Sequence, residues 1–353
     1  MKHLVDLDDF SLEEVEAILN KAIYIKSNMY KFSNSMSGKI IATLFYEPST
    51  RTRLSFQTAM IKLGGQIIGF DTPNTSSIAK GEDLKDTVKI ISEYADIIAI
   101  RHPFEGAARA ASCFSGCPVV NAGDGGHLHP SQTLTDLLTI KETKSSFSNL
   151  TFGFCGDLKH GRTVHSLVKM LLRYKNNKFI FISTDQLKIP DYIKKFIIES
   201  KNQFEESCSL ENSIDKLDIL YMTRIQKERF KFEKTASSAQ ENFFKLKKTT
   251  LKKAKPDMLI LHPLPRINEI DFEVDRDPRA GYFRQAKNGV FARMALITHV
   301  LSTPEFENFP AVTMNQRCCN DRCVTNFEKY LPKRFIKNKE SYFCHYCSQK
   351  LNI

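Results

Sequence analysis

The sequence predicts an α/β fold with two domains whose parallel sheets flank a cleft, followed by a small C-terminal zinc-binding β module. Short apolar segments alternate with amphipathic helical segments along most of the chain, which is typical of α/β architecture. The length of 353 residues suits two domains of ordinary size. Five of the nine cysteines lie from residue 318 onward, and such clustered thiols indicate a metal site.

The first expected domain covers residues 1–132. It begins with a helix at Ser11, where Ser11 and Glu14 can form a capping box. A second helix follows the first strand and ends at two consecutive glycines, a natural C-terminal signal. The strand segments are rich in apolar residues, as expected for strands that are buried on both faces: 38–47, 96–101 and 118–122.

The second expected domain covers residues 133–281, and a final helix over 282–303 returns to the first domain. Helices are expected after residue 132 and over 162–174. The apolar segments that read as strands are 150–154, 178–183, 217–222 and 258–261. Ligands commonly bind in the cleft of such proteins, at the carboxyl ends of the strands. We therefore expect the functional residues at these strand ends.

The charge and hydropathy of the chain exclude some classes of function. The net charge is +11, and two segments carry all of it: residues 227–255 hold ten Lys or Arg against three Glu, and residues 306–353 hold eight against four acidic residues. We interpret these segments as a solvated surface and a small appended module rather than a nucleic-acid site. No apolar stretch approaches a membrane span, and the N-terminus lacks a signal-peptide core, so a cytoplasmic location is expected.

A run of hydroxyl and guanidinium side chains opens the second helix. Ser49, Thr50, Arg51 and Thr52 follow a buried strand and Pro48. Free N–H groups and the helix dipole attract an anion at such a helix start, and Arg adds donors shaped for phosphate. Taken alone, the segment is also compatible with an ordinary N-cap and a solvated arginine.

Residues 45–53 resemble the carbamoyl phosphate signature of the aspartate and ornithine carbamoyltransferase family. The similarity extends through residues 1–305, and three further segments resemble family motifs in the expected order: 129–132, 156–163 and 262–266. The resemblance implies an enzyme that moves the carbamoyl group of carbamoyl phosphate to an amino-acid amine, without an organic cofactor. For aspartate, the products are N-carbamoyl-L-aspartate and phosphate, an early step of de novo pyrimidine (UMP) biosynthesis.

The resemblance also implies the residues that hold carbamoyl phosphate: Ser49, Thr50, Arg51, Thr52, Ser76, Arg101, His129, Gln132, Leu264 and Pro265. Five residues would act directly in catalysis: Arg51, Thr52, Lys80, Arg101 and His129. His129 would donate to the carbamoyl oxygen, together with Thr52 and Arg101, and so stabilise its developing negative charge. Gln132 and the backbone of Leu264 and Pro265 would hold the carbamoyl NH2 group. His127 is a rival by composition, but it does not fall at the family's His-Pro-x-Gln position.

A different segment of the sequence, residues 223–226, indicates which amino acid accepts the carbamoyl group. An aspartate site needs cations for two carboxylates, whereas an ornithine site needs an acidic partner for an ammonium group. Residues 223–226 resemble the aspartate branch, where Arg224 and Gln226 would bind the β-carboxylate and Arg162 the α-carboxylate. The His-Cys-Leu-Pro segment of ornithine enzymes is replaced here by His-Pro-Leu-Pro. Ornithine or a related amino acid is the alternative acceptor.

The loop over residues 74–82 implies an oligomer. In the family this loop reaches into the active site of a neighbouring subunit, so Lys80 would contact the aspartate, and Ser76 and Lys80 would act from the next chain of a homotrimer. Such a trimer has active sites shared between subunits. The resemblance leaves open whether trimers pair into larger assemblies.

The C-terminal cysteines form two close pairs. Cys318 and Cys323 are spaced C-x4-C, and Cys344 and Cys347 are spaced C-x2-C, which suits one tetrahedral, structural Zn²⁺ per chain. Cys319 is an alternative first ligand. Residues 306–353 resemble the zinc domain of the family's regulatory chain, but no room remains for its nucleotide-binding domain, which puts nucleotide regulation in doubt.

A nucleic-acid-binding zinc ribbon is the alternative for this segment. It would use four basic residues, Lys333, Arg334, Lys337 and Lys339, and five aromatic residues, Phe327, Tyr330, Phe335, Tyr342 and Phe343. Aromatic residues in so small a module more often form its core or its docking face. We therefore expect no nucleic-acid partner.

Overall fold

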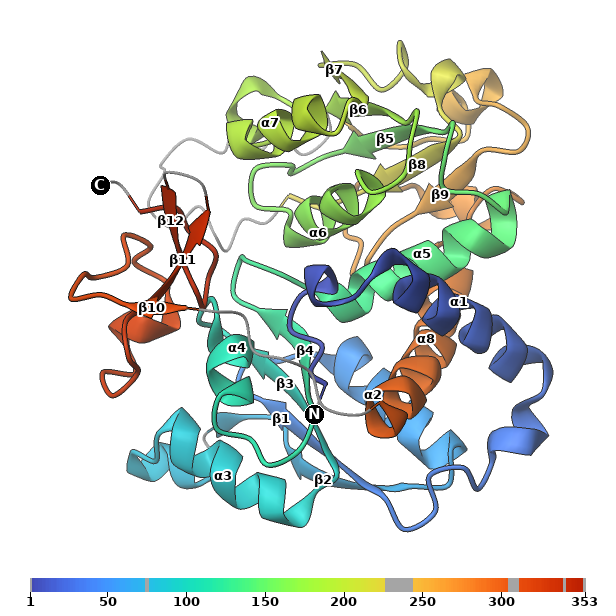
Figure 1. Ribbon diagram of the computed structural model, residues 1–353. Coiled ribbons are helices and arrows are strands. Elements are labelled where there is room, and N and C mark those ends of the chain that lie inside the picture. The colour runs from blue at the N-terminus through green and yellow to red at the C-terminus, as the bar shows by residue number, and fades with distance from the viewer. Residues whose placement is uncertain (1, 74–75, 226–243, 304–310, 339–340, 352–353) are drawn as a thin grey trace. The chain divides into compact units, whose positions relative to one another are not determined.

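The computed structural model describes residues 2–73, 76–225, 244–303, 311–338 and 341–351 (Figure 1). The chain divides into two compact units. The first contains Met1–Ser131 and Val290–Ile353, and the second contains Gln132–Gly289. Each unit has its own parallel sheet, and the C-terminal segment of the first carries a small antiparallel sheet. The fold class expected from the sequence is confirmed.

The sheet of the first unit has the strand order β2-β1-β3-β4, and its strands are all parallel. These strands are β1 (Ile40–Phe45), β2 (Gln66–Phe70), β3 (Ile97–His102) and β4 (Val119–Asp124). The helices of this unit are α1 (Leu12–Ser27), α2 (Thr50–Lys62), α3 (Leu84–Tyr94) and α4 (Ala107–Ser112). The expected capping box of Ser11 and Glu14 is present at the start of α1.

The sheet of the second unit has the order β7-β6-β5-β8-β9, and it is also parallel throughout. Its strands are β5 (Thr151–Cys155), β6 (Lys178–Ile182), β7 (Gln203–Ser207), β8 (Ile219–Met222) and β9 (Leu259–Leu261). The helices are α5 (Pro130–Lys144), α6 (Arg162–Leu171) and α7 (Asp191–Glu199), and α8 (Tyr282–Ser302) continues into the first unit. Stacked phenylalanine rings from β5 and β6 cover one face of this sheet.

Two strands were not expected from the sequence, and both are edge strands. β2 has the sequence QIIGF and β7 has QFEES, and their residues are half-buried or exposed. An edge strand needs no continuous apolar run, because only part of its surface meets the core. The remaining helical segments are short 3-10 turns: Leu7–Asp9, Met29–Phe32, Ser77–Lys80, Asp185–Leu187, Ile214–Lys216, Thr250–Lys253, Phe272–Arg276 and Val324–Asn326. Among the described residues, no helix has the length and apolar character to cross a membrane.

The C-terminal module, drawn in red in Figure 1, contains β10 (Val312–Thr313), β11 (Arg334–Asn338) and β12 (Ser341–Cys344). It packs against the first unit next to the end of β3. The rings of Phe104 and Phe327 stack with centroids 3.6 Å apart. The backbone of Glu105 accepts from Val324 N–H and donates to the carbonyl of Arg322. The module therefore shares a packed interface with the body of the first unit.

Candidate active site and metal site

The phosphate turn lies between β1 and α2, at the carboxyl edge of the first sheet. Ser49 is the N-cap of α2, and Thr52 is buried in the first turn of the helix. Arg53 forms an ion pair with Asp71 at 2.6 Å, so this arginine is engaged by the protein. Arg51 is exposed on the helix start. This arrangement places the free N–H groups and the dipole of a helix, two hydroxyl residues and an exposed arginine at the start of one helix.

Arg101 reaches the same edge from the adjacent strand. Phe45 and Arg101 are partners in the parallel register of β1 and β3, and Tyr46 N–H donates to the Arg101 carbonyl at 2.8 Å. The Arg101 guanidinium lies 3.0 Å from the Glu47 carboxylate. Sequence reasoning did not single out Glu47, although it lies inside the recognised motif. The structure thus brings Arg101 and the phosphate turn together at neighbouring strand ends.

The glycine-rich loop after β4 is held by the buried carboxylate of Asp124. Asp124 accepts hydrogen bonds from the Leu128 N–H at 3.1 Å and the Gly106 N–H at 2.8 Å. The His127 ring lies 3.2 Å from the same carboxylate. Burial acts to lower the pKa of His127, but the Asp124 charge outweighs it, so this pKa is raised. His127 therefore has a structural partner.

His129 differs from His127 in its surroundings. It is only 5% exposed, and its Nδ1 lies 3.4 Å from the Ser131 hydroxyl. Its position directly before α5 is set by the Asp124 loop. Of the two histidines that composition left as rivals, His127 lies against the Asp124 carboxylate and His129 lies near the Ser131 hydroxyl.

His102, next to Arg101, is expected to make the stability of the first unit sensitive to acid. Its Nδ1 accepts the Phe104 N–H at 3.1 Å, and burial lowers its pKa to about 3 despite the opposing charge of Asp124. A histidine in the unfolded chain has a pKa of about 6.5, so below that pH only the unfolded state gains the proton. Stability should then fall by about 1.4 kcal/mol for each pH unit between about pH 6.5 and 3 on account of this group.

The measurement is urea unfolding of the wild type and His102→Asn between pH 7 and pH 5. Asparagine keeps an acceptor for the Phe104 N–H but has no proton to gain. We expect the variant to show a flatter dependence of its unfolding free energy on pH. The same slope in both proteins would contradict the assignment of this acid sensitivity to His102.

Ser76 and Lys80 lie on the loop between β2 and α3. Ser76 donates to the Pro73 carbonyl at 2.8 Å, and Lys80 is an exposed residue at the end of a 3-10 turn. Gly81 ends this turn with φ at 96°, a conformation that favours glycine. Lys80 therefore lies on an exposed part of this loop in the single chain.

Two of the expected aspartate-binding residues lie at the carboxyl edge of the second sheet. β5 and β8 are neighbours, with Cys155 opposite Met222 in their register. Arg224 follows β8, and Arg162 opens α6 after the turn that follows β5. Both arginines are partly buried. Gln226 lies outside the described residues.

Three residues expected to hold the carbamoyl NH2 group also lie in this part of the chain. Gln132 belongs to α5, and Leu264 and Pro265 follow β9. Gln132 lies in the first turn of α5 and donates through Nε2 to the buried carboxylate of Asp136 at 2.7 Å. Leu264 follows β9 with φ at 54°, and the Leu264–Pro265 peptide bond is cis. The Leu264 N–H donates to His262 Nδ1 at 2.8 Å. The sequence analysis did not identify Asp136, which is a partner of Gln132 one helical turn away.

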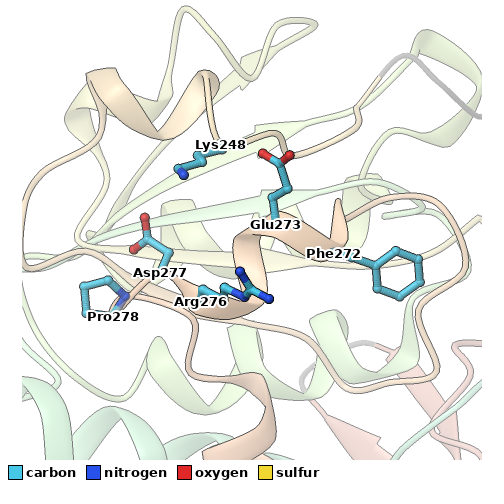
Figure 2. Close-up of a pocket in the computed structure, with 6 residues that line it drawn as sticks. All are labelled: Lys248, Phe272, Glu273, Arg276, Asp277 and Pro278. Atoms are coloured by element: carbon cyan, nitrogen blue, oxygen red, sulfur yellow. The ribbon is translucent and has the colours of Figure 1, made fainter.

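An open pocket of about 540 Å³ lies elsewhere on the second unit (Figure 2). Its lining residues include none of the expected site residues: Lys248, Phe272, Glu273, Arg276, Asp277 and Pro278. The Asp277 carboxylate already pairs with Arg279 at 2.8 Å. We do not assign the expected chemistry to this pocket, because it brings none of the expected donors together.

The four cysteines expected to bind metal meet in the C-terminal module. Their sulfur atoms lie within 4.8 Å of one another, and all four side chains are buried: Cys318, Cys323, Cys344 and Cys347. The pairs recorded at closest range, Cys318 with Cys347 and Cys323 with Cys344, are 3.6 and 3.8 Å apart. Tetrahedral zinc with Zn–S bonds of about 2.3 Å separates its sulfur ligands by about 3.8 Å. The four thiols therefore fit a zinc ion.

Cys319, the alternative ligand, is outside this group. It is exposed, and its sulfur donates to the Lys350 carbonyl at 3.1 Å. Cys318 is the neighbour whose side chain points into the group. Packing places Cys318, and not Cys319, in the thiol group, which the spacing of the cysteines did not specify.

The chain was compared with families of known proteins. Residues 2–142 match the aspartate/ornithine carbamoyltransferase, carbamoyl-P binding domain, and residues 148–300 match the aspartate/ornithine carbamoyltransferase, Asp/Orn binding domain. The chain belongs to the aspartate/ornithine carbamoyltransferase family. Neither family model reaches the C-terminal module.

Individual relatives place the chain in the aspartate branch. It is 57% identical over 301 residues to the aspartate carbamoyltransferase catalytic subunit of Clostridium perfringens, which covers 85% of this chain and 98% of that protein. The corresponding subunit of Clostridium novyi is 58% identical over 300 residues, with the same coverage. The activity expected from the sequence, carbamoyl transfer to aspartate, is confirmed by these relatives.

Solved structures agree with this placement. The catalytic subunit of M. jannaschii aspartate transcarbamoylase matches with a TM-score of 0.79 at 45% identity, over 85% of this chain and 98% of that one. The Trypanosoma cruzi aspartate transcarbamoylase, solved in complex with carbamoyl phosphate and aspartate, matches with a TM-score of 0.77 at 34% identity, over 85% and 97%. These matches support two α/β domains of the same architecture in this chain.

Proposed function

We propose that this chain transfers the carbamoyl group of carbamoyl phosphate to the amine of L-aspartate and releases phosphate. The observation that carries the proposal is the meeting of the phosphate turn and Arg101 at adjacent strand ends, with Phe45 and Arg101 in register. The complexes of the Trypanosoma cruzi enzyme with carbamoyl phosphate and aspartate support these two substrates. The direct test is carbamoyl transfer by the purified chain to aspartate and, separately, to ornithine.

The first domain, residues 1–132 with the returning helix 282–303, would bind carbamoyl phosphate. Ser49, Thr50, Arg51 and Thr52 would hold the phosphate group at the start of α2, where N–H groups and the helix dipole favour an anion. Arg101, Thr52 and His129 would donate to the carbamoyl oxygen. Negative charge grows on that oxygen when the amine attacks, so these donors stabilise the transition state more than the substrate.

The second domain, residues 133–281, would bind aspartate through Arg162, Arg224 and Gln226. The neutral amine attacks the carbamoyl carbon, and a C–N bond forms as the bond between that carbon and the phosphate oxygen breaks. The departing phosphate, held by Arg51, takes the amine proton. Closure of the two domains would supply proximity and orientation, which account for much of the acceleration.

The oligomer belongs to the proposal. Ser76 and Lys80 would act on the substrates bound by a neighbouring chain of a homotrimer, which agrees with the exposed position of Lys80. Assembly of trimers into larger particles and a cytoplasmic location stay predictions. Carbamoyl phosphate and L-aspartate are the proposed small-molecule partners, without nucleic acid or membrane.

The C-terminal module, residues 306–353, would hold one structural Zn²⁺ through Cys318, Cys323, Cys344 and Cys347. Four thiolates complete a tetrahedral shell, so no position remains for a substrate. The proposed transfer draws its donors from Arg51, Arg101 and His129. The metal would therefore stabilise the module, and no organic cofactor is proposed.

Removal of two metal ligands should unfold the module without ending catalysis. A segment of about 48 residues has a small core, so metal binding supplies much of its folding free energy. We expect the Cys344→Ser/Cys347→Ser variant to lose its zinc and to become sensitive to proteolysis after residue 303. Carbamoyl transfer at saturating substrates should stay within about threefold of the wild type, because the catalytic donors are elsewhere.

Cys319→Ser is the matched control, because Cys319 is exposed and lies outside the thiol group. It should retain one zinc per chain by metal analysis. The absence of zinc from the wild-type chain would contradict the metal assignment. Loss of all activity in a double variant that stays trimeric would contradict the structural role.

The nucleic-acid alternative for the module is not favoured by its packing. Phe327 stacks on Phe104, and the Tyr330 hydroxyl accepts the Lys85 N–H at 2.9 Å. Phe335 is buried in the module. These three aromatic residues therefore serve the core or the docking face. Filter binding over a salt series tests the alternative, because phosphate contacts produce a steep salt dependence.

A further inference from the structure

Asp136 is a fully buried carboxylate in the second unit, and side-chain donors bond to both of its oxygens. Its Oδ1 accepts from Gln132 Nε2 at 2.7 Å and from Gln285 Nε2 at 2.6 Å. Its Oδ2 accepts from the Tyr221 hydroxyl at 3.0 Å. Burial and the nearby Asp136 charge raise the pKa of Tyr221 well above its usual value, so this phenol remains a donor. A buried charge needs such donors, because it has left its water behind.

The first consequence is the orientation of the Gln132 amide. A glutamine side chain has one carbonyl acceptor and one NH2 donor, and only the NH2 can bond to a carboxylate. The reverse orientation would place two acceptors 2.7 Å apart, which is repulsive. Asp136 therefore turns Oε1 of Gln132 away from itself. The group that Gln132 can present to a ligand is an acceptor.

The second consequence concerns the hydrogen bonds of the turn after β9. Gln285 also turns its NH2 to Asp136, so its Oε1 accepts the His262 N–H at 2.9 Å. His262 Nδ1 in turn accepts the Leu264 N–H at 2.8 Å, while its Nε2 lies 2.7 Å from Glu269 Oε1. The Leu264 N–H is used inside the turn. The backbone group that this residue can present to a ligand is its carbonyl, again an acceptor.

The backbone conformation of Leu264 is one that needs the hydrogen bonds of Gln285 and His262 to hold it. Its φ of 54° lies in the left-handed region, which is unfavourable for a residue with a Cβ atom. Such a conformation persists where surrounding contacts over-determine it. The chain of hydrogen bonds from Asp136 through Gln285 and His262 supplies contacts of this kind.

We infer that Asp136 is a positioning residue that orients both acceptors of the carbamoyl NH2 group, Gln132 and the Leu264 carbonyl, and so makes the site selective for an NH2 group. The inference rests on the proposed function, which assigns these two groups to the carbamoyl NH2. An NH2 group can donate to both acceptors. A methyl group of similar size cannot, and would leave them unpaired on binding.

Asp136→Leu tests the inference, because it keeps about the size of the side chain and removes both of its acceptors. With no carboxylate at position 136, the Gln132 and Gln285 amides are no longer held with Nε2 toward it. The probes are carbamoyl phosphate as substrate and acetyl phosphate, with methyl in place of NH2, as a competitive inhibitor. We expect the KM for carbamoyl phosphate to rise by about tenfold or more and the inhibition constant of acetyl phosphate to change by less than about threefold.

Tyr221→Phe is the matched control. It removes the donor to Oδ2 but leaves both glutamine contacts with Oδ1 in place. Its melting temperature should fall, while both constants stay within about twofold of the wild type. Should Asp136→Leu fail to fold, Gln285→Met removes only the contact that leads to His262. The same selective rise in the KM for carbamoyl phosphate is expected, with a smaller size.

The outcomes separate this inference from the proposed function. A selective loss of carbamoyl phosphate binding supports the inference. An equal loss for both probes overturns it, because a general structural role weakens the site for either ligand. A wild-type chain that does not carbamoylate aspartate overturns the proposed function as well, whereas an active wild type with parallel changes overturns only the role of Asp136.

Discussion

Arg224→Ala should lower kcat/KM for aspartate by about 10²–10³-fold while the chain keeps its melting temperature. Arg224 lies two residues after the end of β8, at the carboxyl edge of the second sheet, and is partly buried. Aspartate brings two carboxylates to this edge, and a guanidinium can bind one of them through two charge-assisted hydrogen bonds. Removing one partner of such a pair costs about 2–5 kcal/mol, because the other charge is left without compensation. The measurement is steady-state kinetics with aspartate varied at saturating carbamoyl phosphate.

The control for this prediction is Arg276→Ala. Arg276 is also an arginine of the second unit, but it is exposed and lines the open pocket of Figure 2. Its replacement should leave kcat/KM within about twofold of the wild type, because surface substitutions have small effects. An Arg224→Ala enzyme with normal aspartate kinetics would sink the assignment. Comparable use of ornithine by the wild type would sink the choice of acceptor.

Two inactive variants should restore activity when they are mixed. Arg51→Ala and Lys80→Ala should each be nearly inactive alone. If Lys80 acts on the site of a neighbouring chain, hybrid trimers contain sites in which Arg51 comes from one variant and Lys80 from the other. Random assembly of equal amounts makes about one quarter of all sites intact, because each of the two contributions has an even chance. The measurement is carbamoyl transfer after dissociation and reassembly of the mixture.

A mixture of Arg51→Ala with His129→Ala is the control for shared sites. Both residues would serve the site of their own chain, so no combination of subunits makes an intact site. This mixture should stay inactive under the same treatment. Equal recovery in both mixtures, or none in the first, would show that Lys80 does not act across a subunit boundary.

The proposed active-site residues could be named from the sequence because their signals are local in the chain. The helix start at Ser49 needs only a buried strand, a proline and a run of hydroxyl residues in sequence. Arg101 lies near the carboxyl end of an apolar strand and Arg224 lies two residues after another, and the ends of parallel strands meet at one edge. The cysteine spacing predicted a metal site in the same way. In each case the residues that carry the signal are neighbours in the sequence.

Other features involve residues that are far apart in the chain, and no local pattern marks them. Asp136 and Gln285 are separated by 149 positions, and Glu105 contacts a module more than 200 positions away. The edge strands β2 and β7 also escaped prediction, because their half-exposed residues lack an apolar run. Glu47 lies inside the family motif, but only the structure shows that its carboxylate pairs with Arg101.

The sequence by itself determined the α/β class, the family and the acceptor branch, because periodicity and short motifs indicate these directly. It also supplied the residues that we propose for the chemistry. Only the tertiary structure decided which way those side chains are turned. It places Cys318 in the thiol group and Cys319 outside it, and it places the His127 ring against the Asp124 carboxylate. It also turned the Gln132 amide toward a buried carboxylate. The physical reason is that orientation depends on partners brought together by packing, and a buried donor or acceptor must find such a partner wherever the fold places it.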